Sequence, residues 1–259
     1  MRLPLGSQVK NAYWRLRSGR TARASHFAAD FREEFPSQYT GRAAEIFFSN
    51  EAEPIHKWLH YLPIYDELFS PFVGRDIRFL EIGVFRGGSL RMWRQFFGAP
   101  AVLFGIDINP NCAAYDGRHG QVRIGSQSDA GFLKRVVAEM GGVDVVLDDG
   151  SHRAGDQRAS FDTLFPLLSE GGLYVIEDMH TAYWPQWEGG LRRPGTAVEF
   201  LKQKVDEMHR HYAKRGLNTP NAMPEIASVQ FFDSIAAVRK RKQLPRRHVI
   251  VPPIAPEQP

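Results

Sequence analysis

The sequence predicts an α/β protein built on a doubly wound sheet of seven strands, one of them antiparallel. Along most of the chain, short apolar runs typical of buried parallel strands alternate with stretches of helical periodicity. Near the C-terminus, two further runs flank Asp233-Ser234 and indicate a β-hairpin. The expected strands are 77–82, 102–107, 122–124, 143–147, 173–176, 228–232 and 235–239.

The chemistry of the chain is expected to centre on residues 143–152, V-D-V-V-L-D-D-G-S-H. The buried strand of this stretch ends in Asp148-Asp149, and His152 follows one short turn later. The next expected strand, 173–176, ends in a second acidic pair, Glu177-Asp178. If the two strands are neighbours, the carboxylates converge at the edge of the sheet where ligands bind. Such a cluster is costly unless a cation lies within it.

A glycine-rich turn follows the first strand and leads into a helix. The stretch Gly83-Val-Phe-Arg-Gly87-Gly-Ser89 has glycines that permit a sharp turn and a close backbone approach to a ligand. The helix after it offers free N–H groups and a positive dipole end to an anion. The spacing G-x-x-x-G-G matches neither the dinucleotide-binding fingerprint nor a P-loop. A tight strand-to-helix connection that binds no ligand would show the same glycine pattern.

Polar residues after the second and third strands are candidates for nucleoside recognition. Asp107 lies at the distance from the glycine turn where an acid accepts hydrogen bonds from ribose, although a loop or helix-capping acid explains it equally. Gln127 is a candidate for reading an adenine edge, with ordinary loop polarity as the alternative. Ser128 or Asp129 is expected to cap a helix over 132–140.

The remaining segments give coarser expectations. Residues 27–35 and 196–212 are predicted to be helices, and 55–62 a helix that Pro63 kinks and whose apolar face continues to Phe69. His56 and His60 have the spacing of zinc ligands, but the rest of a zinc motif is missing, so we interpret them as ordinary helix residues. The aromatic and glycine-rich segment 181–195 suits either a lid or a packed loop.

The net charge of +4 comes from the two ends of the chain. Residues 1–25 hold six basic residues and no acid, and 239–259 hold six basic residues and one acid, which leaves 26–238 with a net charge of −7. This distribution argues against nucleic-acid binding by the core, and we interpret the basic N-terminal segment as a solvated tail rather than a transit peptide. No apolar run approaches the roughly 20 residues of a membrane span, so no transmembrane segment is expected. The single cysteine, Cys112, excludes an internal disulfide.

Four motifs in this order carry a resemblance to a known family. They are E-I-G-V-F-R-G-G-S, G-I-D-I-N-P, L-D-D-G-S-H and V-I-E-D-M-H-T-A-Y-W. Together they resemble the class I S-adenosylmethionine-dependent methyltransferases with their Rossmann-like fold. More closely they resemble the metal-dependent sugar O-methyltransferases that modify macrolide deoxysugars and bacterial glycans. The expected organisation is a basic extension over 1–50, a catalytic domain over 51–242 and a Pro-rich tail over 243–259.

The resemblance implies a role for each candidate residue. It assigns the cofactor S-adenosylmethionine to Glu81, Gly83, Gly87, Ser89, Asp107, Gln127 and Asp148. It assigns a divalent metal to Asp149, Glu177 and Asp178, and the general base to His152. Oxygen donors favour a hard ion, so Mg²⁺ is expected first, with Mn²⁺ or Ca²⁺ as alternatives.

The expected reaction is methyl transfer from S-adenosylmethionine to a sugar hydroxyl of a glycosylated natural product or bacterial glycan. A sugar hydroxyl is a very weak acid, so a metal that lowers its pKa and a neutral imidazole that takes its proton both serve the reaction. A catechol-like acceptor is the main alternative, because it too offers adjacent oxygens to a metal. A catalytically idle scaffold that binds cofactor or glycan, and a nicotinamide oxidoreductase, fit the residues less well. The expected partner is a small-molecule or glycan acceptor, and no nucleic acid is expected to bind. The sequence is compatible with a homo-oligomer, and the expected location is the cytoplasm.

Overall fold

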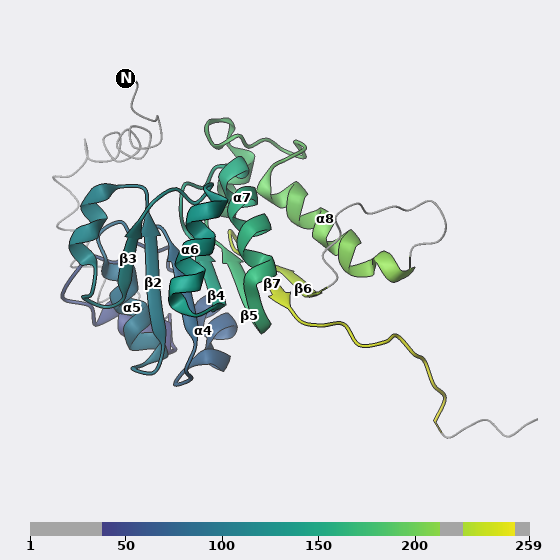
Figure 1. Ribbon diagram of the computed structural model, residues 1–259, viewed down its shortest axis with the longest axis horizontal. Helices are drawn as coiled ribbons and strands as arrows, with labels where there is room; N and C mark the ends of the chain where they lie inside the picture. Colours follow the sequence, from purple (N-terminus) through teal and green to yellow (C-terminus); the bar gives the residue numbers. More distant parts are fainter. Residues whose placement is uncertain (1–37, 213–224, 252–259) are drawn as a thin grey trace, which may run out of the picture.

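The fold is a seven-stranded sheet between two layers of helices, described from a computed structural model for residues 38–212 and 225–251 (Figure 1). The strand order is β3-β2-β1-β4-β5-β7-β6, and β7 runs antiparallel to both of its neighbours. The other pairs are parallel, which confirms the predicted doubly wound sheet with one antiparallel strand. The strands are β1 (Arg78–Ile82), β2 (Val102–Asp107), β3 (Gln121–Ile124), β4 (Val143–Asp148), β5 (Leu168–Ile176), β6 (Ile226–Phe231) and β7 (Ala236–Lys240).

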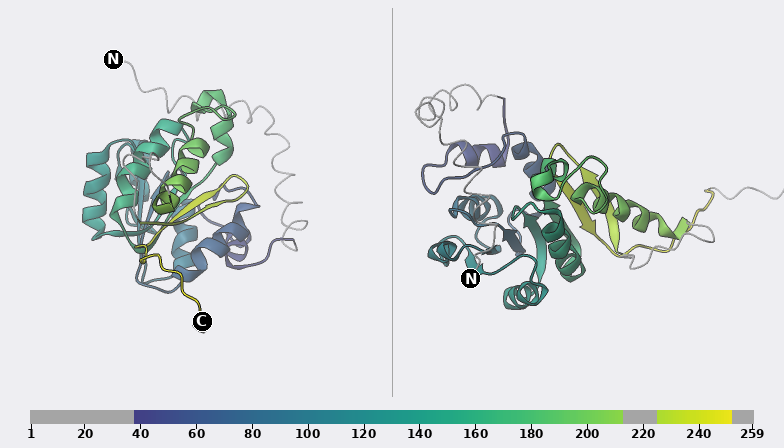
Figure 2. Two further views of the ribbon diagram at one scale, coloured as in Figure 1. Left: turned by 90° about the vertical axis from the view of Figure 1, so that its right-hand side faces the viewer. Right: turned by 90° about the horizontal axis from the view of Figure 1, so that it is seen from above.

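Helices cover both faces of the sheet, as the two views of Figure 2 show. One layer consists of α3 (Arg42–Phe48), α4 (Tyr61–Phe69) and α5 (Gly88–Phe97). The other consists of α6 (Ala130–Met140), α7 (Ala154–Leu164) and α8 (Ala197–His209). Short 3₁₀ turns join the longer elements: η2 (Ser70–Phe72), η3 (Pro110–Tyr115), η4 (Phe165–Leu167), η5 (Met179–Tyr183), η6 (Pro185–Trp187) and η7 (Arg210–Tyr212).

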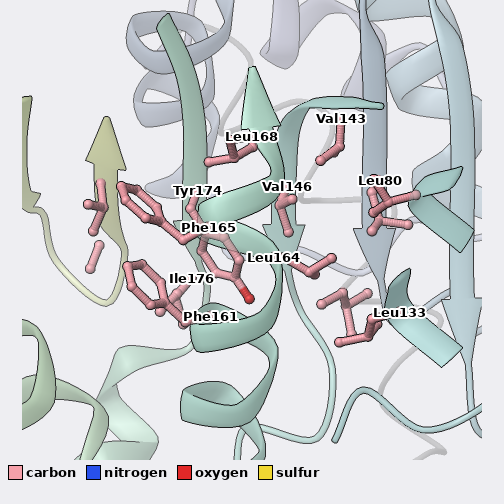
Figure 3. Packing of buried hydrophobic residues seen from close by; sticks show 14 of the residues in the cluster. Leu80, Leu133, Val143, Val146, Phe161, Leu164, Phe165, Leu168, Tyr174 and Ile176 are labelled. Atoms are coloured by element: carbon pink, nitrogen blue, oxygen red, sulfur yellow. The ribbon is translucent and has the colours of Figure 1, made fainter. Parts of the chain in front are cut away.

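The central strands are apolar on both faces because each face contacts a helical layer. In β5, Tyr174 and Ile176 pack toward α7 and α8, whereas Leu173 and Val175 pack toward α4 and α5. Figure 3 shows the first of these cores, where Phe161 of α7 lies against Tyr174. Their ring centroids are 4.9 Å apart, and both residues are fully buried. Continuous apolar runs are the pattern expected for strands of this kind.

The helix predicted over 55–62 is wrong in its position. Residues 50–60 have no regular structure, and α4 begins at Tyr61, so that Pro63 lies in its first turn. Proline lacks an N–H group, and only the first turn of a helix leaves that donor unused. His56 is therefore outside any helix, and His60 precedes α4. The fifth strand is also longer than expected, because it begins at Leu168 and includes Gly171-Gly172.

The ends of the described chain add two facts about its organisation. Helix α3 precedes the expected boundary at residue 51, yet its Ala43 and Ala44 are buried in the same core as α4 and α5. Residues 241–251 lead away from the sheet without helix or strand (Figure 1). The helix predicted over 27–35 lies outside the described residues. Within 38–212 and 225–251, none of the helices has the length and apolarity that crossing a membrane requires.

Candidate active site

The register of the sheet brings the predicted site residues together. Ile82 of β1 pairs with Asp148 of β4, which pairs with Ile176 of β5. Backbone hydrogen bonds continue one residue further, from Asp149 N–H to Ile82 and from Glu177 N–H to Asp148, both 2.9 Å long. Gly83, Asp149 and Glu177 are therefore neighbours at the carboxyl edge, where open α/β sheets bind ligands.

Two glycines of the turn after β1 are required by close contacts. Gly83 has φ +102°, and a Cβ placed there would lie 2.2 Å from the carbonyl oxygen of Asp149. Gly87 has φ +77°, precedes α5, and would place a Cβ 2.7 Å from the ring of Tyr115. A side chain at Gly83 would clash with the acidic segment after β4, so the close packing of the glycine turn on that segment requires glycine at this position.

Glu81 lies below this turn and is completely buried. Its carboxylate accepts hydrogen bonds from Ser89 Oγ at 2.8 Å and from Trp93 Nε1 at 2.9 Å. Burial raises the pKa of Glu81 to about 7, although Lys57 and these two donors oppose the change. A cationic ligand group placed beside it would favour the charged carboxylate.

Asp107, at the end of β2, holds the glycine turn in place. Its Oδ2 accepts hydrogen bonds from the backbone N–H groups of Val84 and Phe85, at 3.0 and 3.1 Å. Its Oδ1 accepts from the N–H of Asn109 at 2.9 Å. Asp107 thus lies beside the turn, with both of its oxygens accepting from backbone N–H groups. Its contact with ribose stays a prediction.

Gln127 and Asp148 form a buried polar pair behind the edge. Gln127 Nε2 donates to Asp148 Oδ1 at 3.1 Å, and Gln127 Oε1 accepts from the N–H of Ser151 at 2.7 Å. Asp148 also accepts hydrogen bonds from Ser160 at 2.6 Å and Tyr174 at 3.1 Å. Burial raises the pKa of Asp148 to about 6 despite these donors. Through these two hydrogen bonds Gln127 fixes the position of the segment after β4. Its contact with adenine stays a prediction.

Three predicted residues meet at the surface of the edge: Asp149, His152 and Asp178. His152 Nε2 lies 3.8 Å from Asp149 Oδ1 and 3.5 Å from Asp178 Oδ2. One donor atom from each residue lies within 4.8 Å of the others, which is close enough for one metal ion to reach all three. The two carboxylates supply the oxygen donors that Mg²⁺ and Mn²⁺ prefer, so this donor set fits a hard divalent ion.

Backbone strain accompanies this arrangement. His152 has φ +59° and Asp178 has φ +56°, in the left-handed region that non-glycine residues rarely adopt. Ser234, in the turn between β6 and β7, has φ +63°. Its backbone oxygen accepts from Met179 N–H at 2.9 Å, and its Oγ contacts His180 Nδ1 at 2.5 Å. Strained residues clustered at one edge are typical of functional sites.

Glu177 is brought to the same edge but points inward. Its side chain is 2 % exposed, whereas those of Asp149 and Asp178 are each 23 % exposed. Glu177 Oε1 accepts from Tyr65 Oη at 2.7 Å, and both oxygens contact Lys57 Nζ, at 3.0 and 2.8 Å. Burial raises the pKa of Glu177, and the Lys57 ammonium opposes this by favouring the carboxylate. Of the three expected metal ligands, Glu177 is therefore the most buried, and both of its oxygens are engaged by protein groups.

Three residues that contact the acids, Lys57, Tyr61 and Tyr65, were not predicted from the sequence. Lys57 Nζ lies 2.8 Å from Asp149 Oδ2, and Tyr61 Oη donates to Asp178 Oδ1 at 2.7 Å. Tyr65 donates to Glu177 in the same way. Although burial raises the pKa of Asp178, His152 and the hydrogen bond from Tyr61 lower it below the usual value. The available signal was the spacing of Tyr61 and Tyr65, which places both hydroxyls on one face of α4.

An aromatic cluster lies beside the acids, formed by Trp58, His180, Trp184 and Trp187. Ring centroids are 5.9 Å apart for Trp58 and His180, 4.7 Å for His180 and Trp184, and 5.6 Å for Trp184 and Trp187. His180 Nδ1 lies 4.0 Å from Asp178, which ties the cluster to the site. Trp58 is 43 % exposed. The cluster thus offers an accessible apolar surface next to the candidate reaction centre.

Comparison with known proteins agrees with this geometry. Residues 80–179 match a family model described as a methyltransferase domain. A 3'-O-methyltransferase for a rhamnosyl tetracenomycin C from Streptomyces olivaceus is 38% identical over 71% of this chain and 50% of its own length. The mycinamicin VI 2''-O-methyltransferase of Micromonospora griseorubida is 37% identical over 72% of this chain and 50% of its own length.

A solved structure supports the same assignment. The MycE methyltransferase of mycinamycin biosynthesis, in complex with Mg, SAH and mycinamycin VI, superposes with a TM-score of 0.67 and 33% identity. The match covers 78% of this chain and 54% of MycE. The chain thus spans about half the length of the curated relatives it matches. The sheet, the glycine turn and these comparisons together identify residues 80–179 as a methyltransferase domain and the chain as a relative of S-adenosylmethionine-dependent sugar O-methyltransferases.

Proposed function

We propose that the protein transfers a methyl group from S-adenosylmethionine to a hydroxyl of a sugar in a glycosylated natural product or bacterial glycan. The observation that carries the proposal is the meeting of Asp149, His152 and Asp178 at the edge that also holds the glycine turn. The sugar acceptors named for the relatives support the acceptor class. The proposed location is the cytoplasm.

The proposed cofactor site is the turn Gly83–Ser89 with its neighbouring acids. Glu81 would face the ammonium group of the methionyl end, and Asp107 would accept hydrogen bonds from the ribose hydroxyls. Asp148 and Gln127 would border the methionine and adenine parts respectively. The solved relative that binds SAH supports S-adenosylmethionine as the donor.

The proposed metal site is formed by Asp149 and Asp178, with Glu177 as a third carboxylate behind them. Mg²⁺ or Mn²⁺ bound there would lower the pKa of an acceptor hydroxyl and fix its position. Asp178 is oriented for this role by the hydrogen bond from Tyr61. The Mg present in the MycE complex supports the assignment.

His152 is the proposed general base. Its side chain is 14 % exposed and its Nε2 lies within 4 Å of a carboxylate oxygen of both Asp149 and Asp178, which hold the ring at the edge of the sheet. Neutral imidazole would accept the hydroxyl proton at Nε2, and S-adenosylmethionine held by the glycine turn would supply the methyl group, so that the products are a methyl ether and S-adenosylhomocysteine. A hard ion prefers the carboxylate oxygens, which leaves the imidazole nitrogen for the proton.

The aromatic cluster is the proposed contact for the acceptor ring. The C–H face of a pyranose packs well on aromatic side chains, and Trp58 and Trp184 offer such a surface next to Asp178. A flat catechol would pack there as well, so a catechol-like phenol is the second candidate acceptor. Both acceptors present adjacent oxygens to a metal, and only an acceptor assay separates them.

The decisive experiment is a mass-spectrometric assay of methyl transfer. Purified protein is incubated with S-adenosylmethionine and Mg²⁺ against rhamnosyl tetracenomycin C, glycosylated macrolides and simple catechols, with and without a chelator. We expect a mass gain of one methylene on the sugar, its loss with chelator, and a decrease in kcat of roughly 10²–10⁴ for His152→Ala. His209→Ala, an exposed histidine on α8, is the control.

Each part of the proposal has its own contradicting result in this assay. Methylation of catechols alone would reject the sugar acceptor. Full turnover in excess chelator would reject the metal, and wild-type kcat in His152→Ala would reject the base. Binding of S-adenosylmethionine without transfer to any acceptor of the panel would favour a scaffold.

A further inference from the structure

Lys57 is a buried cation inside the candidate metal site. It belongs to the irregular segment 50–60, which passes over the start of α5 so closely that a Cβ on Gly88 would lie 2.3 Å from the carbonyl oxygen of Pro54. The Lys57 side chain is 1 % exposed. Its Nζ lies 2.8 Å from Asp149 Oδ2 and 2.8 Å from Glu177 Oε2.

Five of the six carboxylate oxygens of the site divide into two sets, and the sixth, Asp178 Oδ1, accepts a hydrogen bond from Tyr61. Asp149 Oδ2 and both oxygens of Glu177 face the Lys57 ammonium. Asp149 Oδ1 and Asp178 Oδ2 face His152 instead. Asp149 is thus shared between the ammonium and the outer position where the donor atoms of Asp149, His152 and Asp178 converge.

The charges of the site explain why a cation is present at Asp149 and Glu177. A buried carboxylate without a partner is strongly destabilising, and Glu177 is buried. Burial by itself would lower the pKa of Lys57, but Asp149 and Glu177 hold it above its usual value, so the ammonium keeps its charge. Three carboxylates and one ammonium leave a net charge of −2, so the site attracts a divalent cation even though Lys57 already occupies Asp149 and Glu177.

We propose that Lys57 is a resident counter-ion that competes with a divalent cation for the carboxylates of Asp149 and Glu177. This inference rests on the metal use in the proposed function. A cation bound at Asp149 is repelled by an ammonium in contact with the same carboxylate, and the repulsion is strong where water is excluded. Lysine suits this role because its flexible four-carbon stem lets a compact charge withdraw. The site then has a lysine-paired state without metal and a metal-paired state.

The test compares Lys57→Met with the wild type in metal binding and thermal unfolding, without measuring turnover. Mn²⁺ is titrated and the free ion is counted by electron paramagnetic resonance. We expect Lys57→Met to bind Mn²⁺ at least tenfold more tightly, to unfold at a lower temperature without metal, and to gain more in Tm on Mn²⁺ addition. Lys57→Arg, which keeps the charge, should bind Mn²⁺ no more tightly than the wild type.

Lys204→Met is the matched control. Lys204 is also a largely buried lysine, 2.8 Å from Glu207, but it lies on α8 away from the acids. Its replacement should lower Tm and leave Mn²⁺ affinity unchanged.

The outcomes separate the inference from the proposed function. If the wild type binds Mn²⁺ and Lys57→Met binds it equally or less tightly, the competition is rejected while the metal assignment stands. Absence of Mn²⁺ binding in both proteins would overturn the metal assignment and the competition together. A Lys57→Met protein that folds only in the presence of Mn²⁺ supports the proposal, whereas failure to fold even with Mn²⁺ contradicts it, because the metal should replace the ammonium.

Discussion

Protonation of Glu81 is expected to control how cofactor affinity depends on pH. Glu81 is fully buried, and burial raises its pKa to about 7 even though Lys57, Trp93 and Ser89 favour the carboxylate. The proposed position of the ligand ammonium beside this group would stabilise the charged form and lower the pKa in the complex. Binding should therefore release a proton from Glu81 and weaken as the pH falls through about 7.

The size of the effect follows from that pKa. With a free-protein pKa of about 7 and a much lower value in the complex, apparent affinity at pH 6 falls about tenfold below its plateau and at pH 7 about twofold. About half a proton should be released per ligand at pH 7, and nearly one at pH 6. The α-amino group of the ligand titrates near pH ~8, so measurements should stay below about pH 7.5.

Isothermal titration calorimetry measures both quantities. S-adenosylmethionine and S-adenosylhomocysteine are titrated from pH 5.5 to 7.5 in two buffers that differ in ionisation enthalpy, and the difference in observed heat counts the protons. Glu81→Gln should bind both compounds more weakly and without the affinity change near pH 7. An unchanged pH dependence in Glu81→Gln would refute this assignment. The proton would then be released by another group, such as Asp148, whose pKa is about 6.

Other predictions address stability and the acceptor. Two nitrogens of Arg78 donate to Asp144 at 2.9 Å, and they lower the pKa of Asp144 although burial opposes this. The pair therefore stabilises the fold at pH values above the unfolded-state pKa of Asp144, and this stabilisation is lost as the pH falls through its folded-state pKa. Denaturant titrations of Arg78→Met should show a loss of about 1–3 kcal/mol at pH 7 and a smaller loss at pH 3; equal losses would contradict the linkage. Phe161→Ala should cost about 3–5 kcal/mol of unfolding free energy in urea titrations, because this fully buried ring contacts three aromatic neighbours; a loss below about 1 kcal/mol would mean that the core refills the space. In steady-state kinetics, Trp184→Ala should raise KM for the acceptor with S-adenosylmethionine affinity unchanged, whereas an unaltered KM would exclude the aromatic cluster from acceptor binding.

The sheet was predictable because its strands are buried on both faces. Runs such as 102–107 and 143–147 combine apolar residues with flanking turn residues, and β2 and β4 begin at the expected positions. The helix over 55–62 was predicted wrongly for a related reason. Trp58, Tyr61 and Leu62 have helical spacing, but the periodicity does not reveal that residues 50–60 are irregular and place Lys57 against the acids.

The acids of the site were predictable and their partners were not. Strand ends locate Asp149 and Glu177 in the sequence, and the parallel register then makes them neighbours. In the sequence, Lys57 is 92 positions from Asp149, and Tyr65 is 112 positions from Glu177. Local sequence patterns therefore do not reveal these contacts. A tyrosine in the apolar stripe of a helix gives the same pattern whether its hydroxyl contacts a carboxylate or water.

The acidic edge therefore depends on the segment that precedes the sheet as much as on the strands themselves. Within the described residues, Lys57 pairs with both Asp149 and Glu177, while Tyr61 and Tyr65 donate to Asp178 and Glu177. Burial and the neighbouring carboxylates raise the pKa of both tyrosines above the usual value, so their hydroxyls stay protonated and keep donating. Carboxylates with such partners can remain clustered before a metal arrives, which an unpartnered set of like charges cannot do. A methyltransferase sheet with the same strand-end acids but without these three partners would need its cation to be bound before the edge could form.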